Sequence, residues 1–315
     1  MTSYAIVHGD DADGLTCGAF LMRLQGCQVY LANYDNLENA LAKVQPPVTL
    51  LTICDLNIRE ALMGELTRIR GFSDVRIIDH HQMDSALMES LTGLGVQVTL
   101  DSRDCAAVLV YDAFKEQLGW EASRLAAYAA ISDMFEDGPL ASALLGRMDR
   151  KFAQHEAQIL THALSMDQTL DFKRLAIKEL SDYSYPHRIP GAVEAAVRCL
   201  EEMAALKEVI PASATVKGRV AIMEAVGDHS TGAIANLLMD KLGVDVGVSY
   251  KANGDYVNVS LRGMTDLEEH LGDMAKALGQ ELGGFGGGHQ RASGVKLPKD
   301  KLTPFLDEVV HRLSP

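Results

Sequence analysis

The stretch HGDDADG near the start of the chain gathers side chains that could bind a metal ion. It places His8, Asp10, Asp11 and Asp13 within six residues. Hard divalent cations such as Mn²⁺ and Mg²⁺ prefer carboxylate and water ligands, and Mn²⁺ also accepts imidazole. A single Asp at such a turn more often caps a helix, because its oxygens accept hydrogen bonds from backbone N–H groups. So many acids close together would repel one another without a cation, so the whole set favours a metal site.

Two apolar runs further along the chain also end in candidate ligands. Asp55 closes VTLLTICD, and Asp79, His80 and His81 close VRIIDHH. In an open parallel sheet, ligands bind beyond the carboxyl ends of the strands, so we expect these residues to share one rim with HGDDADG. Such a set could hold two cations about 3.5–4 Å apart, an arrangement suited to phosphoryl chemistry.

The elements that would position these residues follow from the apolar pattern. Continuous apolar runs alternate with helical patterns in the first part of the chain, which is typical of strands buried on both faces of a parallel sheet. The predicted fold class is α/β, with a doubly wound parallel-sheet N-terminal domain whose core spans 1–137. A helical connector over 138–212, partly packed on that domain, leads to a smaller mixed α/β domain over 213–315. A hairpin is expected to turn at Asn253-Gly254, a strong hairpin signal.

The last domain supplies residues that could bind phosphate. The stretch GGFGGGHQRASG would let backbone N–H groups approach a phosphate, and NVSLRG adds a hydroxyl and a guanidinium. A flexible glycine loop and a solvated arginine are the alternatives. Phe285 either stacks on a base or packs the loop onto the core. The candidate substrate-binding residues are Ser260, Arg262, Gly286, Gly287, Gly288, His289 and Arg291.

Composition narrows the substrate and the location. The 315 residues carry a formal net charge of −14 and only 6% aromatic residues. Because affinity for long nucleic acids comes largely from Lys and Arg on phosphates, we expect short substrates and no binding of long duplexes. The sequence has no apolar run long enough to span a membrane and no leader pattern, so we expect a cytoplasmic protein without membrane contacts. The five widely spaced cysteines are expected to be reduced core residues. A homodimer is left open.

The combination of DADG, CD, DHH, a later acid in AISDMFED and GGGHQRASG resembles the DHH phosphoesterases with the DHH-associated C-terminal domain. That family includes RecJ-type exonucleases, nanoRNases with adenosine-bisphosphate phosphatase activity, and cyclic-dinucleotide phosphodiesterases. The resemblance covers nearly the whole chain. It implies an enzyme with two Mn²⁺ ions on the first domain, Mg²⁺ or Co²⁺ being alternatives, and substrate bound through the second.

The resemblance also implies roles for individual residues. Asp55 would bridge the two ions, His81 would lie against the substrate phosphate or the attacking water, and Asp79 would orient the histidines. Arg262 and His289 would hold a terminal or scissile phosphate. The implied metal ligands are His8, Asp11, Asp13, Asp55, His80 and Asp133, the last on the predicted helix over 123–137.

One departure from the family concerns the first ligand. Members of the nanoRNase type commonly read HxxxDxD, whereas His8 precedes Asp11 by three residues. Asp10 is therefore an alternative to His8 as a ligand, and Asp137 is an alternative to Asp133.

The predicted function is a Mn²⁺-dependent phosphodiesterase that cleaves short oligoribonucleotides or linear dinucleotides to nucleoside monophosphates. Removal of a phosphate from adenosine 3′,5′-bisphosphate and cleavage of cyclic dinucleotides are the enzymatic alternatives. A catalytically silent nucleotide-binding protein is the alternative outside enzymes.

Overall fold

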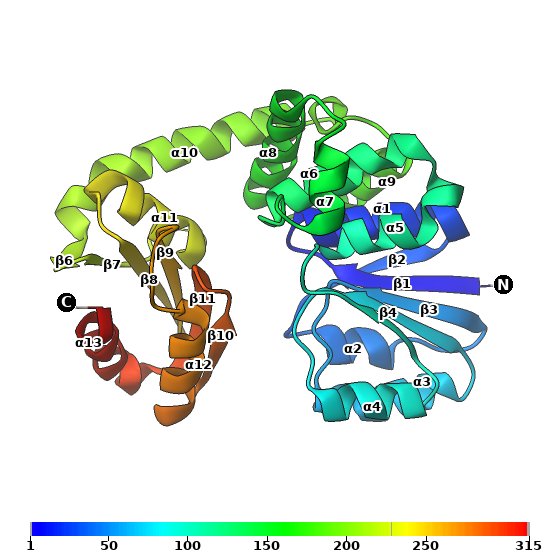
Figure 1. Cartoon of the computed structure of the whole chain (residues 1–315), viewed down its shortest axis with the longest axis horizontal. Coiled ribbons are helices and arrows are strands. Elements are labelled where there is room, and N and C mark those ends of the chain that lie inside the picture. Colours follow the sequence, from blue (N-terminus) through cyan, green and yellow to red (C-terminus); the bar gives the residue numbers. More distant parts are fainter. Residues whose placement is uncertain (1, 228, 314–315) are drawn as a thin grey trace. The chain divides into compact units, whose positions relative to one another are not determined.

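A computed structural model describes residues 2–227 and 229–313 of the chain. The chain divides into two compact units, residues 1–200 and residues 201–315, each described below by itself (Figure 1). In the described residues, we find no helix that combines the length and the apolar character needed to cross a membrane.

The N-terminal unit is built on a five-stranded parallel sheet with the strand order β2-β1-β3-β4-β5. Its central strands are almost fully buried because helices cover both faces, which explains their continuous apolar sequences. All five carboxyl ends lie at one edge of the sheet because every pair is parallel. The strands are β1 (Thr2–His8), β2 (Gln28–Ala32), β3 (Val48–Cys54), β4 (Asp74–Asp79) and β5 (Gln97–Leu100).

Helices cover the two faces of this sheet in the predicted doubly wound manner (Figure 1). On one face lie α1 (Ala12–Gln25), α5 (Ala106–Leu118) and α6 (Ser123–Ser132). On the other lie α2 (Leu37–Ala42), α3 (Met63–Arg70) and α4 (Ser85–Gly93).

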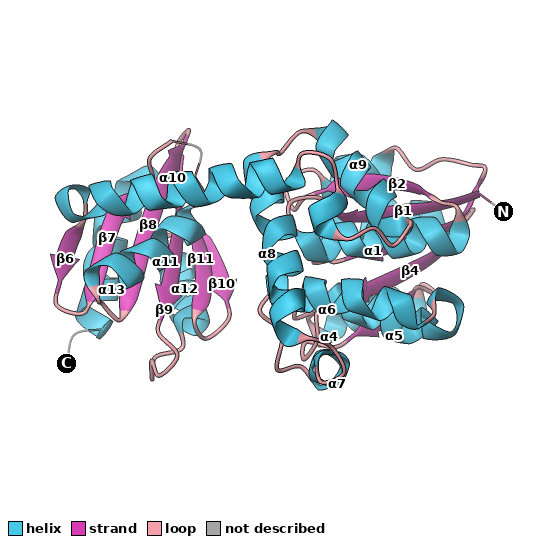
Figure 2. Ribbon diagram, turned by 90° about the horizontal axis from the view of Figure 1, so that it is seen from above, coloured by secondary structure: helices cyan, strands magenta, loops and turns pink. Residues whose placement is uncertain are grey.

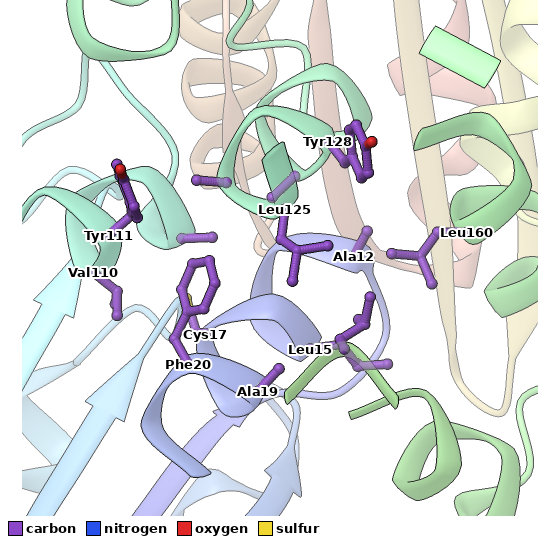
Figure 3. Packing of buried hydrophobic residues seen from close by; sticks show 14 of the residues in the cluster. Ala12, Leu15, Cys17, Ala19, Phe20, Val110, Tyr111, Leu125, Tyr128 and Leu160 are labelled. Atoms are coloured by element: carbon purple, nitrogen blue, oxygen red, sulfur yellow. The ribbon is translucent and has the colours of Figure 1, made fainter. Parts of the chain in front are cut away.

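Helix α1 lies at the centre of the larger core. Its side chains Leu15 and Phe20 are fully buried and pack among residues of α5, α6 and α8 (Arg150–Met166), as Figure 3 shows for Leu125 and Leu160. Burying a large apolar side chain contributes about 1.5–3 kcal/mol each. The helix that begins within the HGDDADG stretch is thus anchored firmly in the core.

The helices after residue 138 extend this same core. Apolar residues of α7 (Pro139–Leu145), α8 (Arg150–Met166) and α9 (Leu170–Ser181) are buried together with those of α1 and α6. The division between the units falls later, inside α10 (Ala192–Ser213), than the predicted start of the connector at 138. Short 3-10 turns occur at Glu60–Leu62, Trp120–Ala122, Pro186–Arg188 and Lys299–Lys301.

The C-terminal unit contains a mixed six-stranded sheet with the order β10-β11-β9-β8-β7-β6, whose strands lie side by side in Figure 2. Buried faces of α11 (Thr231–Leu242), α12 (Leu271–Glu281) and α13 (Leu302–Leu313) pack against this sheet. The strands are β6 (Thr215–Lys217), β7 (Val220–Glu224), β8 (Val246–Asn253), β9 (Tyr256–Gly263), β10 (Phe285–Gly288) and β11 (Ala292–Pro298).

Three local predictions in this unit need correction or refinement. The hairpin turn lies one residue later than predicted, since Asn253 pairs with Tyr256 and Gly254 has φ 60°. The glycine run is an edge strand, β10, paired with β11, rather than a flexible loop. Phe285 is 61% exposed, so the alternative that it packs into the core is wrong.

The cysteines match the prediction. All five are buried, and each is outside any disulfide bond.

Candidate metal centre

The turn between β1 and α1 begins the site. Asp11 caps α1, and its Oδ1 accepts a hydrogen bond of 3.0 Å from the backbone N–H of Gly14. A Cβ atom at position 14 would lie 2.2 Å from the carbonyl oxygen of His8. Only glycine therefore lets α1 begin so close to the end of β1. Asp11 thus caps the helix, which was the alternative to metal binding, but the cap uses only one of its two oxygens.

The first group of donor atoms joins His8, Asp11 and Asp55. Nδ1 of His8 lies 2.6 Å from Oδ2 of Asp11 and 3.5 Å from Oδ2 of Asp55. The second oxygen of Asp11 thus points to the histidine while the first caps the helix. Two carboxylates and an imidazole at these separations form a set suited to Mn²⁺.

A second group joins Asp13, His80 and Asp133. Nε2 of His80 lies 3.6 Å from Oδ2 of Asp133. The carboxylate of Asp13 is buried, and its two oxygens accept backbone hydrogen bonds of 2.8 Å from Ala106 and Ala107 at the start of α5. This anchors Asp13 while each of its oxygens keeps lone pairs for a cation.

Asp133 corrects one detail of the prediction. Helix α6 ends at Ser132, so Asp133 is its C-terminal cap and not a residue within the helix. The chain then leaves the helix through Met134, whose φ is 61°. A residue at a helix end can aim its side chain away from the helix face, and Asp133 reaches the donor group from this position.

Asp55 lies between the two groups. Its Oδ1 is 3.2 Å from Nε2 of His80, and its Oδ2 is 3.5 Å from Nδ1 of His8. Its φ of 58° is in the left-handed region, which costs about 1–3 kcal/mol for a residue other than glycine. One carboxylate with an oxygen toward each donor group has the geometry expected of a bridging ligand.

Asp79 orients both histidines of the DHH triplet. Its Oδ1 accepts hydrogen bonds from the backbone N–H of His80 at 2.8 Å and from Nδ1 of His81 at 2.8 Å. Nε2 of His81 lies 2.9 Å from the hydroxyl of Tyr34, a residue that sequence reasoning missed. His81 is thus fixed at Nδ1 and turned toward the site at Nε2.

Burial and mutual repulsion raise the pKa values of three acids in the site. Burial and the charges of Asp13 and Asp55 raise the pKa of Asp133 to about 10. Burial and a neighbouring carboxylate raise the pKa of Asp55 and that of Asp13 to about 7. Without a cation, these carboxyl groups hold protons that a metal ion would displace.

The pKa values of the three histidines shift in different directions. Burial alone would lower the pKa of His8, but hydrogen bonds to Asp11 and Asp55 and their charges raise it to about 11. Burial lowers the pKa of His80, which keeps its imidazole neutral and able to donate a lone pair. Burial would also lower the pKa of His81, but its hydrogen bond to Asp79 raises it.

Buried atoms without hydrogen-bond partners also fit a metal site. Within the described ranges, Oδ2 of Asp55, Oδ2 of Asp79, Nδ1 of His80 and Oδ2 of Asp133 are buried and accept or donate no hydrogen bond. Such atoms are costly to bury, at about 1–3 kcal/mol each. Cations held by carboxylates and imidazole would satisfy the oxygens, so the residues present fit one or two hard divalent metal ions.

Asp10 and Asp137 lie outside the donor groups that the described residues form. Oδ1 of Asp10 accepts a 2.9 Å ion pair from Lys173 of α9, a residue that is 7% exposed. The structure thus pairs Asp10 with Lys173 and groups His8, not Asp10, with Asp11 and Asp55, although Oδ2 of Asp10 lies 4.0 Å from Nε2 of His8. No sequence pattern links Asp10 to Lys173, which lies on a different helix.

The predicted phosphate ligands on β9 meet the start of α11 within the C-terminal unit. The hydroxyls of Ser260 and Thr231 lie 2.7 Å apart. A Cβ at Gly232 would lie 2.5 Å from Nη2 of Arg262, so this glycine makes room for the guanidinium beside the first turn of α11. The sequence STG at 230–232, a helix N-cap followed by a small residue, was the signal that could have added Thr231 and Gly232.

The other predicted phosphate ligands lie at the same end of this sheet. Residues 286–288 form most of β10, and His289 and Arg291 lie in the turn to β11, where the backbone N–H of His289 donates to the carbonyl of Ala292. Register pairs Ala292 with Arg262, which brings that turn beside the end of β9.

Fold and site together define a two-domain α/β protein with adjoining groups of side chains that could hold metal ions. The family model for the DHHA1 domain matches residues 217–314. An uncharacterized protein of Methanocaldococcus jannaschii is 40% identical over 80 residues, which span 25% of this chain and only 18% of that protein.

Solved structures with the same fold cover nearly the whole chain. The pGpG-specific phosphodiesterase PggH of Vibrio cholerae covers 99% of this chain and 98% of its own, with a TM-score of 0.59 and 11% identity. The DHH domain of a member of the s1p family of ribosomal proteins covers 98% of this chain and 86% of its own, with a TM-score of 0.70 and 15% identity. RecJ of Thermus thermophilus, solved in complex with Mn²⁺, covers 98% of this chain and 52% of its own, with a TM-score of 0.67 and 19% identity. The chain thus has the fold of the DHH family, with a DHHA1 domain at its C-terminal end, as the motifs predicted.

Proposed function

We propose that this protein is a metal-dependent phosphodiesterase that hydrolyses short oligoribonucleotides or linear dinucleotides to nucleoside monophosphates. The observation that carries the proposal is the position of Asp55, whose two oxygens face two separate groups of donor atoms. A carboxylate shared between two cations is the arrangement used for in-line displacement at phosphorus.

The cofactor would be two Mn²⁺ ions, with Mg²⁺ or Co²⁺ as alternatives. His8, Asp11 and Asp55 would hold one ion, and Asp13, His80 and Asp133 would hold the other together with Asp55. When bound, such ions make water a stronger nucleophile at neutral pH and neutralise charge on the phosphate.

The remaining residues of the rim would orient the reactants. Asp79 holds His81 through Nδ1, so that Nε2 is the atom directed at the site. A substrate oxygen or the attacking water can take the place that the hydroxyl of Tyr34 has beside Nε2. Fixing the imidazole in advance lowers the entropy lost when the substrate is positioned.

Recognition of a terminal phosphate is assigned to Arg262, Ser260 and His289. Burial lowers the pKa of the Arg262 guanidinium, which lies beside the N-terminal turn of α11. Its Nη1 donates to the backbone carbonyl of Leu261 at 3.0 Å. A partly buried cation at the positive end of a helix dipole is unfavourable by itself, and a bound anion would offset both charges.

The charge of the whole chain favours short substrates. With a formal net charge of −14, it would repel a long polyanion, whereas a dinucleotide can be held by local donors and bound cations.

The test is a panel of substrates with metal-stripped protein, to which Mn²⁺ is then added. RNAs of two to ten nucleotides, adenosine 3′,5′-bisphosphate and cyclic dinucleotides would be resolved by product. We expect nucleoside monophosphates from the short RNAs, and no product in EDTA or with Asp55→Asn. Preferred turnover of the bisphosphate or of a cyclic dinucleotide would move the assignment to that alternative. Binding of nucleotides without turnover of any of them would show a silent protein and refute the proposal.

A further inference from the structure

A cavity of about 430 Å³ adjoins His81 on the rim of the N-terminal sheet. Its walls come from Gln82 and Met83, which follow β4, from Leu100 at the end of β5, and from residues 101–103, which follow β5. Ligand pockets generally range over about 300–1,000 Å³, so this space suits a small molecule the size of a nucleoside.

The cavity lies at the same edge of the sheet as the donor groups. Those groups lie at the carboxyl ends of β1, β3 and β4, and the cavity lies at the ends of β4 and β5, one strand further along the same edge. His81 adjoins both, because it forms a further group of possible ligand atoms with Asp55, Asp79 and His80 and also lines the cavity. A phosphate held at the donor groups would therefore have one of its two ester substituents next to this space.

The side chains of the cavity combine apolar and polar character. Leu100 and Met83 offer apolar surface, and Gln82 and Ser102 offer donors and acceptors for the edge of a base. This mixture is typical of sites for small amphipathic ligands, which need apolar contact and a few orienting polar groups.

Arg103 is held in one orientation by Asp101. Its Nε and Nη2 donate to the two carboxylate oxygens at 2.9 and 2.7 Å, and its backbone N–H donates to Oδ1 at 3.0 Å. The guanidinium remains 70% exposed, so the ion pair contributes little to stability but removes rotamer freedom. Proteins stack RNA bases on planar guanidinium groups as well as on aromatic rings.

We propose that this cavity is a nucleoside subsite, in which the base adjacent to the scissile phosphate stacks on the guanidinium plane of Arg103. The subsite rests on the proposed function, because it supposes that the phosphate lies at the donor groups. It makes the enzyme selective for diesters that carry a nucleoside on the His81 side, whatever the second substituent is.

The test compares a substrate with a nucleoside and one without. Hydrolysis of the dinucleotide pApA and of bis(p-nitrophenyl) phosphate would be measured for wild type, Ser102→Trp, which fills the cavity, and Arg103→Lys, which keeps the charge but removes the plane. Base stacking supports about a tenfold rise in KM for pApA in both variants, with the nitrophenyl ester changed less than about twofold. Arg312→Lys is the control, because Arg312 is also partly exposed and paired with a carboxylate, that of Glu308 at 2.9 Å.

The outcomes separate the subsite from the proposed function. Equal losses on both substrates, or no loss on either, would overturn the subsite while leaving the phosphodiesterase in place. Absence of all diester hydrolysis by wild type would instead refute the proposed function. In that case equilibrium dialysis with AMP decides on the cavity: binding by wild type that Ser102→Trp and Arg103→Lys both weaken would support it, and equal binding or none would overturn it.

Discussion

Replacing Asp133 by asparagine should stabilise the metal-free protein at pH 8 and remove most of the stabilisation that Mn²⁺ gives. The Asp133 carboxyl is crowded by Asp13 and Asp55, and asparagine keeps its shape without its charge. The same repulsion that would favour a bound cation is a cost to the fold when no cation is bound.

The direction follows from proton binding. The pKa of Asp133 is raised from 3.8 to about 10, so the folded protein binds this proton more tightly than the unfolded chain. Stability from this group is therefore greatest at low pH and falls as the pH rises from about 3.8 toward 10. His8 acts with the same sign: its pKa, raised from 6.5 to about 11, gives stability that is complete below about pH 6.5 and is lost progressively as the pH rises toward 11.

The size of the effect is limited by exposure and by the neighbours. A pKa difference of one unit corresponds to about 1.4 kcal/mol, so the range from 3.8 to 8 sets an upper limit of about 6 kcal/mol. Because the Asp133 side chain is 29% exposed, and because Asp13 and Asp55 can take up the proton instead, we expect a gain of about 2 kcal/mol. For a unit of this size that corresponds to a rise in Tm of about 4–8 °C.

Thermal unfolding followed by fluorescence is the assay. Trp120 is the single tryptophan of the chain and lies in the N-terminal unit, so it reports on the unit that carries Asp133. Scans in EDTA at pH 5.5 and pH 8 should show wild type losing stability as the pH rises, and the variant losing less. Saturating Mn²⁺ at 100 times its Kd should add about 2.7 kcal/mol to wild type and much less to the variant.

A control residue separates this effect from a general loss of negative charge. Asp137→Asn removes an exposed carboxylate four residues away, outside the donor groups, and should leave both the Tm in EDTA and the response to Mn²⁺ unchanged. An Asp133→Asn variant that is less stable than wild type in EDTA at pH 8, or that keeps the full response to Mn²⁺, would refute the reasoning.

Three further predictions concern ligands and substrate. Asp55→Asn should abolish turnover without lowering the Tm in EDTA, because an amide keeps a single oxygen and cannot present one to both donor groups; full Mn²⁺-dependent activity would exclude a bridging role. Lys173→Met should weaken Mn²⁺ binding about tenfold in calorimetry, because Lys173 holds Asp10, whose Oδ2 lies 4.0 Å from Nε2 of the proposed ligand His8, and groups that support metal ligands typically contribute about 10–100-fold. Lys178→Met on the same helix, which breaks an exposed pair, should not weaken it, and equal effects of the two would remove the special role of Lys173. His289→Ala should raise KM with little change in kcat, and a loss confined to kcat would make it a catalytic acid instead.

The strands that carry the metal ligands were predictable because their signal is local. β1, β3 and β4 are continuous apolar runs, buried on both faces, and each ends at the acids or histidines that the pattern singled out. β2 and β10 were missed for a physical reason. β2 alternates between exposed and partly buried residues at the edge of its sheet, and β10 is mostly glycine, so pairing with a distant strand decides the conformation of both.

The sequence alone determined which kinds of side chain follow each strand, and therefore that carboxylates and imidazoles would gather at one rim. The continuous apolar runs indicate buried parallel strands, and the carboxyl ends of parallel strands all lie at the same edge of the sheet. Only the tertiary structure decided which atoms meet. Asp55 turns one oxygen to each donor group through a left-handed backbone, and Asp10 is drawn to Lys173, 163 residues away. Such contacts depend on packing between distant segments, which no local pattern of residues specifies.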